Sequence, residues 1–179
     1  MKSGYVAVIG RANAGKSTLI NVLVGEKVAI VSPKPQTTRD RILGVLTTKD
    51  YQIVFIDTHG IYKADNLLNS VMQRTTTDTA GDADEVLFLL DAHEGLSEQD
   101  RKNISRFASL SVPVTIVLTK IDIMPESLLI SELKELADCG AEVVPISARK
   151  GKNLKTLLDV ILKNLPESDK IFTEDVISD

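Results

Sequence analysis

Short runs of apolar, often β-branched residues alternate along the chain with segments whose apolar residues recur at helical spacing. The short runs predict strands at residues 5–9, 42–48, 51–56, 86–91, 114–119 and 143–146. The helical spacing predicts helices at residues 16–24, 66–79, 97–110, 125–138 and 154–165. This alternation is typical of the α/β class, in which a mostly parallel sheet carries helices on both faces.

Residues typical of turns, helix caps and helix ends refine the predicted elements. Only Lys49 and Asp50 separate the second and third strands, so we expect these two strands to pair as an antiparallel hairpin. Ser97 and Asp100 form the pattern of a capping box at the start of a helix. Pro166 ends the last helix, so we predict one domain over residues 1–166, followed by a C-terminal tail or linker over residues 167–179.

Composition limits the class of protein. The chain has 179 residues, of which 43% are hydrophobic and 26% charged, as expected for one globular domain with a real core. A net charge of −4 argues against a strong nucleic-acid binder. No apolar stretch has the length of a membrane span, and we expect a cytoplasmic protein. Cys139 is the single cysteine, which excludes an internal disulfide.

The most informative segment is residues 10–17, Gly-Arg-Ala-Asn-Ala-Gly-Lys-Ser, which follows a predicted strand and precedes a predicted helix. Its glycines let backbone N–H groups turn inward around phosphate oxygens, and the helix N-terminus adds a positive end. Lys16 is placed to reach the β- and γ-phosphates, and the Ser17 hydroxyl is suited to ligate magnesium. The residues expected to contact a nucleoside triphosphate here are Asn13, Ala14, Gly15, Lys16, Ser17 and Thr18. A glycine-rich turn with a chance lysine is the alternative, and the strand and helix flanks disfavour it.

A second candidate segment, Asp57-Thr58-His59-Gly60, comes directly after the third strand. Asp57 can hold magnesium through water, and the Gly60 N–H can contact a γ-phosphate. A turn of this composition is weak evidence alone, and its distance of about forty residues from the phosphate loop strengthens it.

Two later strands end in polar residues that can recognise a base. Asp122, which follows Thr119 and Lys120, can accept two hydrogen bonds from guanine that adenine does not offer, so it indicates a GTP site. The Lys120 stem can lie over the base. In the segment Ser147-Ala148-Arg149, the Ala148 N–H can meet the guanine carbonyl oxygen. Without the phosphate loop, a solvated lysine and a capping aspartate would be the simpler interpretation.

Taken in order, the segments GRANAGKS, QTTRDR, DTHG, TKID and SARKG resemble the motifs of the Era family, bacterial GTPases of small-subunit ribosome maturation. The resemblance covers essentially all of residues 4–179. It implies a Ras-like P-loop GTPase domain with a six-stranded sheet, one strand antiparallel, that binds GTP or GDP with Mg²⁺ and hydrolyses GTP as a molecular switch. By position, Thr38 would ligate magnesium only when a γ-phosphate is present. Asn13 matches the residue that holds K⁺ in potassium-activated members.

Departures from the family pattern shape the expected activity. Ile61 stands where Ras-like enzymes carry a water-orienting glutamine, so we expect slow intrinsic turnover that rests on Lys16, Thr38, Gly60 and Asn13, stimulated by potassium. Thr119 replaces the asparagine that ties down the phosphate loop, which implies reduced nucleotide affinity. A guanine-nucleotide-sensing module with negligible hydrolysis is therefore the alternative. Asp122 disfavours a third hypothesis, an ATP-using phosphotransferase.

The family also continues into a KH-type RNA-binding domain, and the resemblance extends only to the start of the linker before it. We therefore expect an isolated or truncated G domain. The resemblance implies 16S rRNA and the 30S subunit as partners of the whole family member, and peripheral association with the inner membrane.

Overall fold

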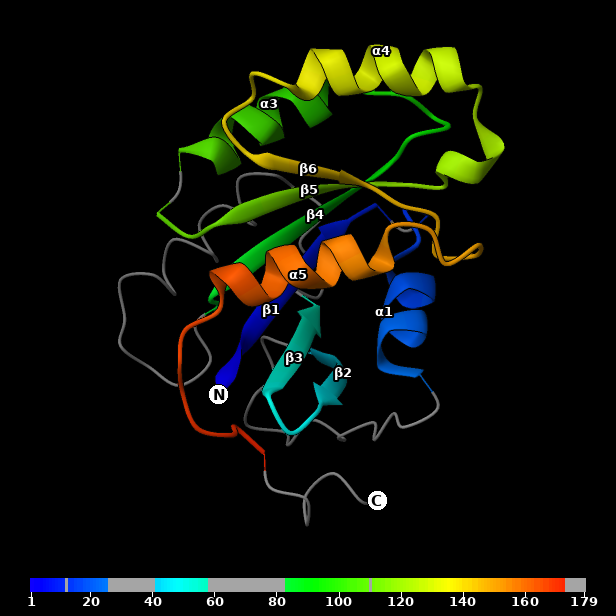
Figure 1. The fold of residues 1–179 in the computed structure, drawn as a ribbon. Helices are drawn as coiled ribbons and strands as arrows, with labels where there is room; N and C mark the ends of the chain where they lie inside the picture. The colour runs from blue at the N-terminus through cyan, green and yellow to red at the C-terminus, as the bar shows by residue number, and fades with distance from the viewer. Residues whose placement is uncertain (12, 26–40, 58–82, 110, 173–179) are drawn as a thin grey trace.

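The computed structural model describes residues 1–11, 13–25, 41–57, 83–109 and 111–172. Six strands form one sheet in the order β2-β3-β1-β4-β5-β6, shown in Figure 1. Their bounds are β1 (Lys2–Gly10), β2 (Arg41–Thr47), β3 (Tyr51–Asp57), β4 (Glu85–Asp91), β5 (Val114–Thr119) and β6 (Glu142–Pro145). Each predicted strand is therefore present, and β1 extends three residues further toward the N-terminus than its apolar run suggested.

The strand directions also match the prediction. β1 pairs parallel with β3 and with β4, and the ladder continues parallel through β5 to β6. β2 alone runs antiparallel, paired with β3. The hairpin turn between them is closed by the Thr48 hydroxyl, which accepts hydrogen bonds from the backbone N–H groups of Asp50 and Tyr51 at 3.2 and 3.1 Å.

Helices cover both faces of the sheet. α1 (Lys16–Val24) and α5 (Leu154–Asn164) pack on one face; Figure 1 shows α5 in front of the strands and α1 to their right. α3 (Glu98–Ala108) and α4 (Glu126–Leu136) pack on the other. The two faces take alternate residues of the central strands, for example Val8 toward α1 and α5, and Ala7 toward α3 and α4. The helix predicted at residues 66–79 lies outside the described residues.

α3 begins at the predicted pair of capping residues, Ser97 and Asp100. The capping box of α3 is confirmed: Asp100 N–H donates to Ser97 Oγ at 3.1 Å, and Ser97 N–H donates to Asp100 Oδ2 at 2.9 Å. Within the described ranges, no helix is both long enough and apolar enough to span a bilayer.

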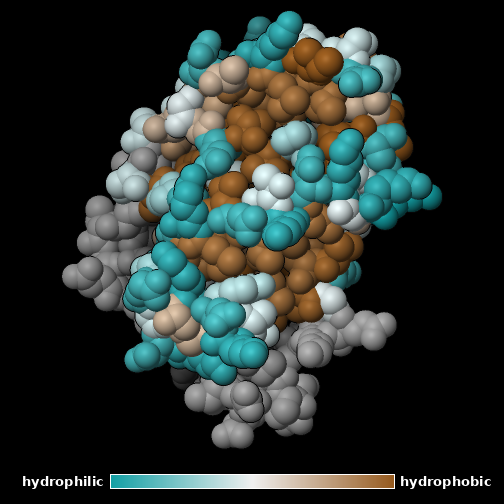
Figure 2. Space-filling model, viewed as in Figure 1, coloured by the Kyte–Doolittle hydropathy of each residue, from teal (hydrophilic) through white to brown (hydrophobic). Residues whose placement is uncertain are grey.

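Most large apolar side chains are buried in the two layers between the helices and the sheet. Figure 2 shows polar residues interspersed with apolar ones over the face that carries α5. Among the described residues, four large hydrophobic side chains are exposed, spread over α1, α4 and the turn after β5: Val22, Ile123, Leu128 and Ile130. These positions are scattered and form no continuous apolar stripe along one element.

The segment after α5 is tied back to the sheet by a buried glutamine. Gln52 on β3 accepts hydrogen bonds from the N–H groups of Ile171 and Phe172 at 2.7 and 2.9 Å, and its amide donates to the Phe172 carbonyl at 2.9 Å. Ile171 and Phe172 also pack against the core on the α3 and α4 face. The chain therefore stays in contact with the domain through residue 172, beyond the boundary at 166 that Pro166 suggested.

A buried carboxyl group begins β4. The Glu85 side chain is fully buried, and its Oε1 accepts hydrogen bonds from Thr115 Oγ1 at 2.8 Å and Asn164 Nδ2 at 3.1 Å. Its Oε2 has no partner among the described residues. Burial raises the pKa of Glu85 from its usual value to about 7, and the two hydrogen bonds only partly offset this.

This shift predicts a pH-dependent stability. The carboxyl group is protonated more readily in the folded than in the unfolded chain, so its stabilising contribution is complete below about pH 4.5 and is lost as pH rises through 7. Relative to Glu85→Gln, the wild type should lose about 3 kcal/mol of unfolding free energy between pH 4.5 and 8.5, measured by urea denaturation. The exposed Glu94→Gln variant is the control and should track the wild type. A Glu85→Gln profile parallel to the wild type would contradict this assignment.

Candidate functional site

The predicted site residues within the described ranges gather at one edge of the sheet. Parallel strands share a direction, so their carboxyl ends meet there, which is where ligands bind in open α/β sheets. Residues 10–17 connect β1 to α1, and Asp57 ends β3. Thr119 ends β5, and Ser147 follows β6. The site is thus assembled from four separate strand ends.

Two glycines allow the phosphate loop, residues 10–17, to take its path. A Cβ on Gly10 would lie 3.1 Å from both the Cβ and the carbonyl oxygen of Leu89, so a larger residue here would require its neighbours to shift by a few tenths of an ångström. Gly15 has φ +92°, which places it in the left-handed region immediately before α1. Substitution at Gly15 would therefore strain the turn that leads into the helix.

The loop is held from outside by the end of β5. Thr119 Oγ1 donates to the Ala14 carbonyl at 2.7 Å, and Lys120 Nζ donates to the Asn13 carbonyl at 2.6 Å. In a trans peptide the N–H points opposite to the carbonyl, so an outward Ala14 carbonyl directs the Gly15 N–H toward the inside of the loop. Two carbonyls of the loop are therefore held by contacts within the protein.

The contact from Thr119 bears on one expectation from the sequence. Reduced affinity was expected because threonine replaces an asparagine that ties down the loop. Thr119 is 3% exposed, and its hydroxyl lies within hydrogen-bond distance of the carbonyl oxygens of Ala14 and Leu90, at 2.7 and 3.3 Å. One hydroxyl donates one proton, and the shorter contact is to the loop. The tie to the loop is therefore retained, whereas the effect of Thr119 on nucleotide affinity stays a prediction.

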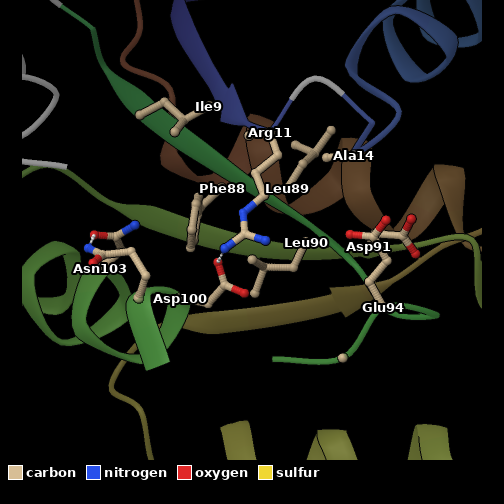
Figure 3. A pocket seen from close by; sticks show the side chains of 13 residues that line it. Ile9, Arg11, Ala14, Phe88, Leu89, Leu90, Asp91, Glu94, Asp100 and Asn103 are labelled. Carbon is tan, nitrogen blue, oxygen red and sulfur yellow. Dashed lines mark hydrogen bonds and ion pairs between the residues drawn. The ribbon is translucent and has the colours of Figure 1, made fainter. Parts of the chain in front are cut away.

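Arg11 connects the loop to α3. Its guanidinium donates to Ser97 Oγ at 3.0 Å and lies 3.6 Å from Asp100 Oδ1, which are the two residues of the capping box. Figure 3 shows Arg11 extending toward Asp100 along a cavity of about 170 Å³ between the loop, β4 and α3. Asp91 and Asn103 line opposite sides of this cavity. The loop is thus held on a second side, although Arg11 is exposed and its contacts are weaker.

The start of α1 faces the space that the loop encloses. No side chain caps this helix, so its first N–H groups remain available to an acceptor such as a phosphate. Lys16, the first residue of α1, pairs with Asp57 at the end of β3, with 3.3 Å between Nζ and Oδ1. Both side chains are about one fifth exposed. Lys16 and Asp57 therefore lie together, whereas Ser17 and Thr18 lie on the first turn of α1 and are both exposed.

A second cavity of about 230 Å³ opens beside the loop. It is lined by predicted site residues from three segments and by Ile123: Gly15, Thr18, Thr119, Lys120, Asp122, Ile123, Ala148 and Arg149. The residues assigned to a base from the sequence thus surround one hollow next to the residues assigned to phosphates. A nucleotide has its base at one end and its phosphates at the other. The residues assigned to a base and those assigned to phosphates lie next to each other in the same way, and they meet at Gly15 and Thr18.

The carboxylate in this cavity is held in place. Ser147 Oγ donates to Asp122 Oδ1 at 2.9 Å, and Ser147 itself is fully buried. Asp122 lies in the short 3₁₀ helix η2 (Ile121–Ile123), which starts because Lys120 takes a left-handed conformation with φ +61°. One oxygen of Asp122 is thereby fixed, and its carboxylate plane is set relative to the cavity.

Four residues that the sequence singled out, Thr38, His59, Gly60 and Ile61, lie outside the described residues, so their predicted roles stay predictions. Three residues at the site were not predicted from the sequence: Asp91, Arg11 and Ile123. Asp91 offered a signal that could have been used, because it is a carboxylate at the carboxyl end of a buried strand, as Asp57 is.

Comparison with known proteins adds independent information. The sequence model of a family described as 50S ribosome-binding GTPase matches residues 5–120. The chain is 42% identical to GTPase Era of Clostridium novyi over 180 residues and 45% identical to GTPase Era of Clostridium botulinum over 180 residues. Each alignment covers 99% of this chain and 61% of the relative, so the chain spans about three fifths of the curated relatives' length.

A solved structure agrees with these relatives. A point variant of Aquifex aeolicus Era, crystallised bound to GDP·AlF4⁻, superposes with a TM-score of 0.72 at 43% identity, covering 98% of this chain and 61% of that one. The predicted fold class, a Ras-like P-loop GTPase fold with six strands, is thereby confirmed.

The tie from Thr119 predicts a stability effect. Thr119→Val keeps the shape but removes the donor, leaving the buried Ala14 carbonyl without its partner, so the variant should lose about 1–3 kcal/mol in urea denaturation. Thr119→Ser retains the hydroxyl and should recover most of this loss. Equal stability of the Val and Ser variants would show that the hydrogen bond to the loop contributes nothing.

Proposed function

This chain belongs to the 50S ribosome-binding GTPase family, and from that premise we propose that it acts as an Era-type nucleotide switch domain. In this proposal it binds GTP and Mg²⁺, hydrolyses GTP to GDP and phosphate, and reports its nucleotide state through residues 25–42 and 58–65.

The proposal rests on one observation above all: the cavity assigned to the base and the loop assigned to the phosphates meet at Gly15. The cavity beside the loop presents the Asp122 carboxylate, held by Ser147, and a guanine ring can satisfy that carboxylate with two N–H donors. Adenine cannot do so in the same arrangement. Asp122 is exposed in this structure, and a base seated in the cavity would cover it. An acceptor that the wrong base covers and leaves unpaired can discriminate by roughly 10⁴, so guanine is the base that we propose.

At the phosphate end of the site, the proposed contacts follow from charge. The Lys16 ammonium and the N–H groups of the first turn of α1 are the positive groups next to the loop. Phosphate oxygens would draw Lys16 away from Asp57, because the pair between them is partly exposed and 3.3 Å long. The carboxylate released in this way becomes available as an oxygen ligand.

The residues present fit a magnesium ion. Ser17 and Asp57 offer a hydroxyl and a carboxylate, the hard oxygen donors that Mg²⁺ prefers, and Lys16 beside Ser17 already contacts Asp57. Thr38 is proposed as a further ligand. Bound magnesium would supply neutralisation of the charge on the β- and γ-phosphates. Lys16 and the loop N–H groups would orient the same phosphates.

We propose a slow, potassium-stimulated reaction. Ile61 cannot orient a water molecule by hydrogen bonding, so stabilisation must come from the loop N–H groups, Lys16 and the Gly60 N–H. Asn13 is exposed at the loop, and its backbone carbonyl is already held by Lys120, which leaves its side chain as the candidate K⁺ ligand.

A ribosomal partner is also proposed. The family description names the 50S subunit, whereas the resemblance of the motifs favours the 30S subunit and its 16S rRNA. Cosedimentation of the GTP-bound chain with each purified subunit separates these options, and binding to neither would contradict a ribosomal partner for this domain alone.

Phosphate release tests the activity. With Mg²⁺ and K⁺, the chain should release phosphate from GTP slowly but measurably, and not from ATP. Lys16→Ala should abolish the release, since it removes the positive charge at the phosphates. GTP binding without any turnover over hours would favour a sensing module instead, and equal turnover of ATP would contradict the guanine assignment.

The matched potassium test repeats the GTP assay in Na⁺. The wild-type rate should fall in Na⁺, and Asn13→Ala should be slow in both salts, because the side chain that would hold K⁺ is gone. Equal wild-type rates in the two salts would exclude the Asn13 role.

A further inference from the structure

Asp91, the last residue of β4, has a nearly buried carboxylate with both oxygens engaged. Its side chain is 8% exposed. Oδ2 accepts from Lys120 Nζ at 2.9 Å, and Oδ1 accepts from the His93 backbone N–H at 2.9 Å. The turn that follows is closed by Glu94 N–H donating to the Asp91 carbonyl at 3.2 Å. The carboxylate is therefore fixed by its own turn before any contact with Lys120 is made.

Lys120 in turn depends on Asp91 for its position. Its ammonium is bound on one side by the Asn13 carbonyl, a neutral acceptor, and on the other by Asp91, a charged one. The Lys120 side chain is 38% exposed, so without the carboxylate it could exchange the loop contact for water. A charge-assisted hydrogen bond to a nearly buried partner is stronger than one to a neutral carbonyl.

The position of Lys120 matters to both halves of the site. It lines the cavity assigned to the base and holds the phosphate loop at Asn13. Figure 3 shows Asp91 below Ala14 among the residues that line the first cavity. Asp91 does not line the base cavity, so its contact with Lys120 is made from outside that cavity.

We propose that Asp91 is a positioning residue for guanine-nucleotide binding. It keeps Lys120 against the loop and beside the base cavity, so that both are assembled before the nucleotide arrives. This inference rests on the proposed function. Removing the charge lowers the fraction of molecules with an assembled site, and the apparent affinity falls by the same factor.

The test measures binding of fluorescently labelled GDP to the 179-residue chain. Asp91→Asn is nearly isosteric and should bind GDP about tenfold more weakly, mainly through faster dissociation. Glu94→Gln removes a negative charge from the same cavity lining, where no side-chain contact with Lys120 is made, and should stay within about twofold of the wild type. Wild-type affinity in Asp91→Asn would overturn the inference.

A double-mutant cycle with Lys120 separates positioning from a general structural effect. In a Lys120→Met background, Asp91→Asn should cause no further loss of GDP affinity, because its only route to the site is gone. The same tenfold loss in both backgrounds would overturn the inference. Asp91→Glu retains the charge and should bind within about threefold of the wild type. A loss equal to that of Asp91→Asn would also overturn it.

Thermal melting without nucleotide shows whether a variant fails to fold. If Asp91→Asn does not fold, GDP binding by Asp91→Glu compared with the wild type decides whether the inference holds. The outcome is also distinct from failure of the proposed function. A wild-type chain that does not bind GDP contradicts the proposed function, whereas GDP binding that is insensitive to Asp91 contradicts only the positioning role.

Discussion

The structure depends on two backbone carbonyls of the phosphate loop being held from outside. The Thr119 hydroxyl binds the Ala14 carbonyl and the Lys120 ammonium binds the Asn13 carbonyl, so the end of β5 sets the shape of the loop after β1. β4 lies between these two strands in the sheet, and the lack of a Cβ at Gly10 lets the loop pass close to it without a shift of its neighbours. Sheet order and loop shape are therefore parts of the same constraint.

The two lysines of the site are held by carboxylates in different ways, and this difference accounts for their roles. Lys16 meets Asp57 at 3.3 Å with both groups partly exposed, which suits a pair that separates when phosphate arrives. Lys120 meets Asp91 at 2.9 Å, and Asp91 is nearly buried, which suits a pair that persists. In the proposed function, the Lys16–Asp57 pair separates at the phosphates and the Lys120–Asp91 pair persists beside the base.

Much of this was predictable, because strand runs and their polar ends are local patterns. Alternation of apolar residues located all six strands, and the order of polar strand ends brought residues 13–18, 119–122 and 147–149 to one edge. Contacts between distant segments were not predictable, since nothing local links Asp91 to Lys120 or Gln52 to Phe172. The tie that Thr119 makes to the loop was not predictable for the same reason: it depends on a carbonyl 105 residues away.

The most direct test of the central claim is the base specificity of binding, measured with GDP, ADP and XDP on the wild type and on Asp122→Asn. If Asp122 reads the ring N–H and amine of guanine, the wild type should bind GDP and reject ADP by a factor of roughly 10⁴. In Asp122→Asn the amide can donate to the extra carbonyl of xanthine, so preference should move from GDP to XDP. Comparable binding of ADP and GDP by the wild type, or an unchanged preference in the variant, would contradict the account.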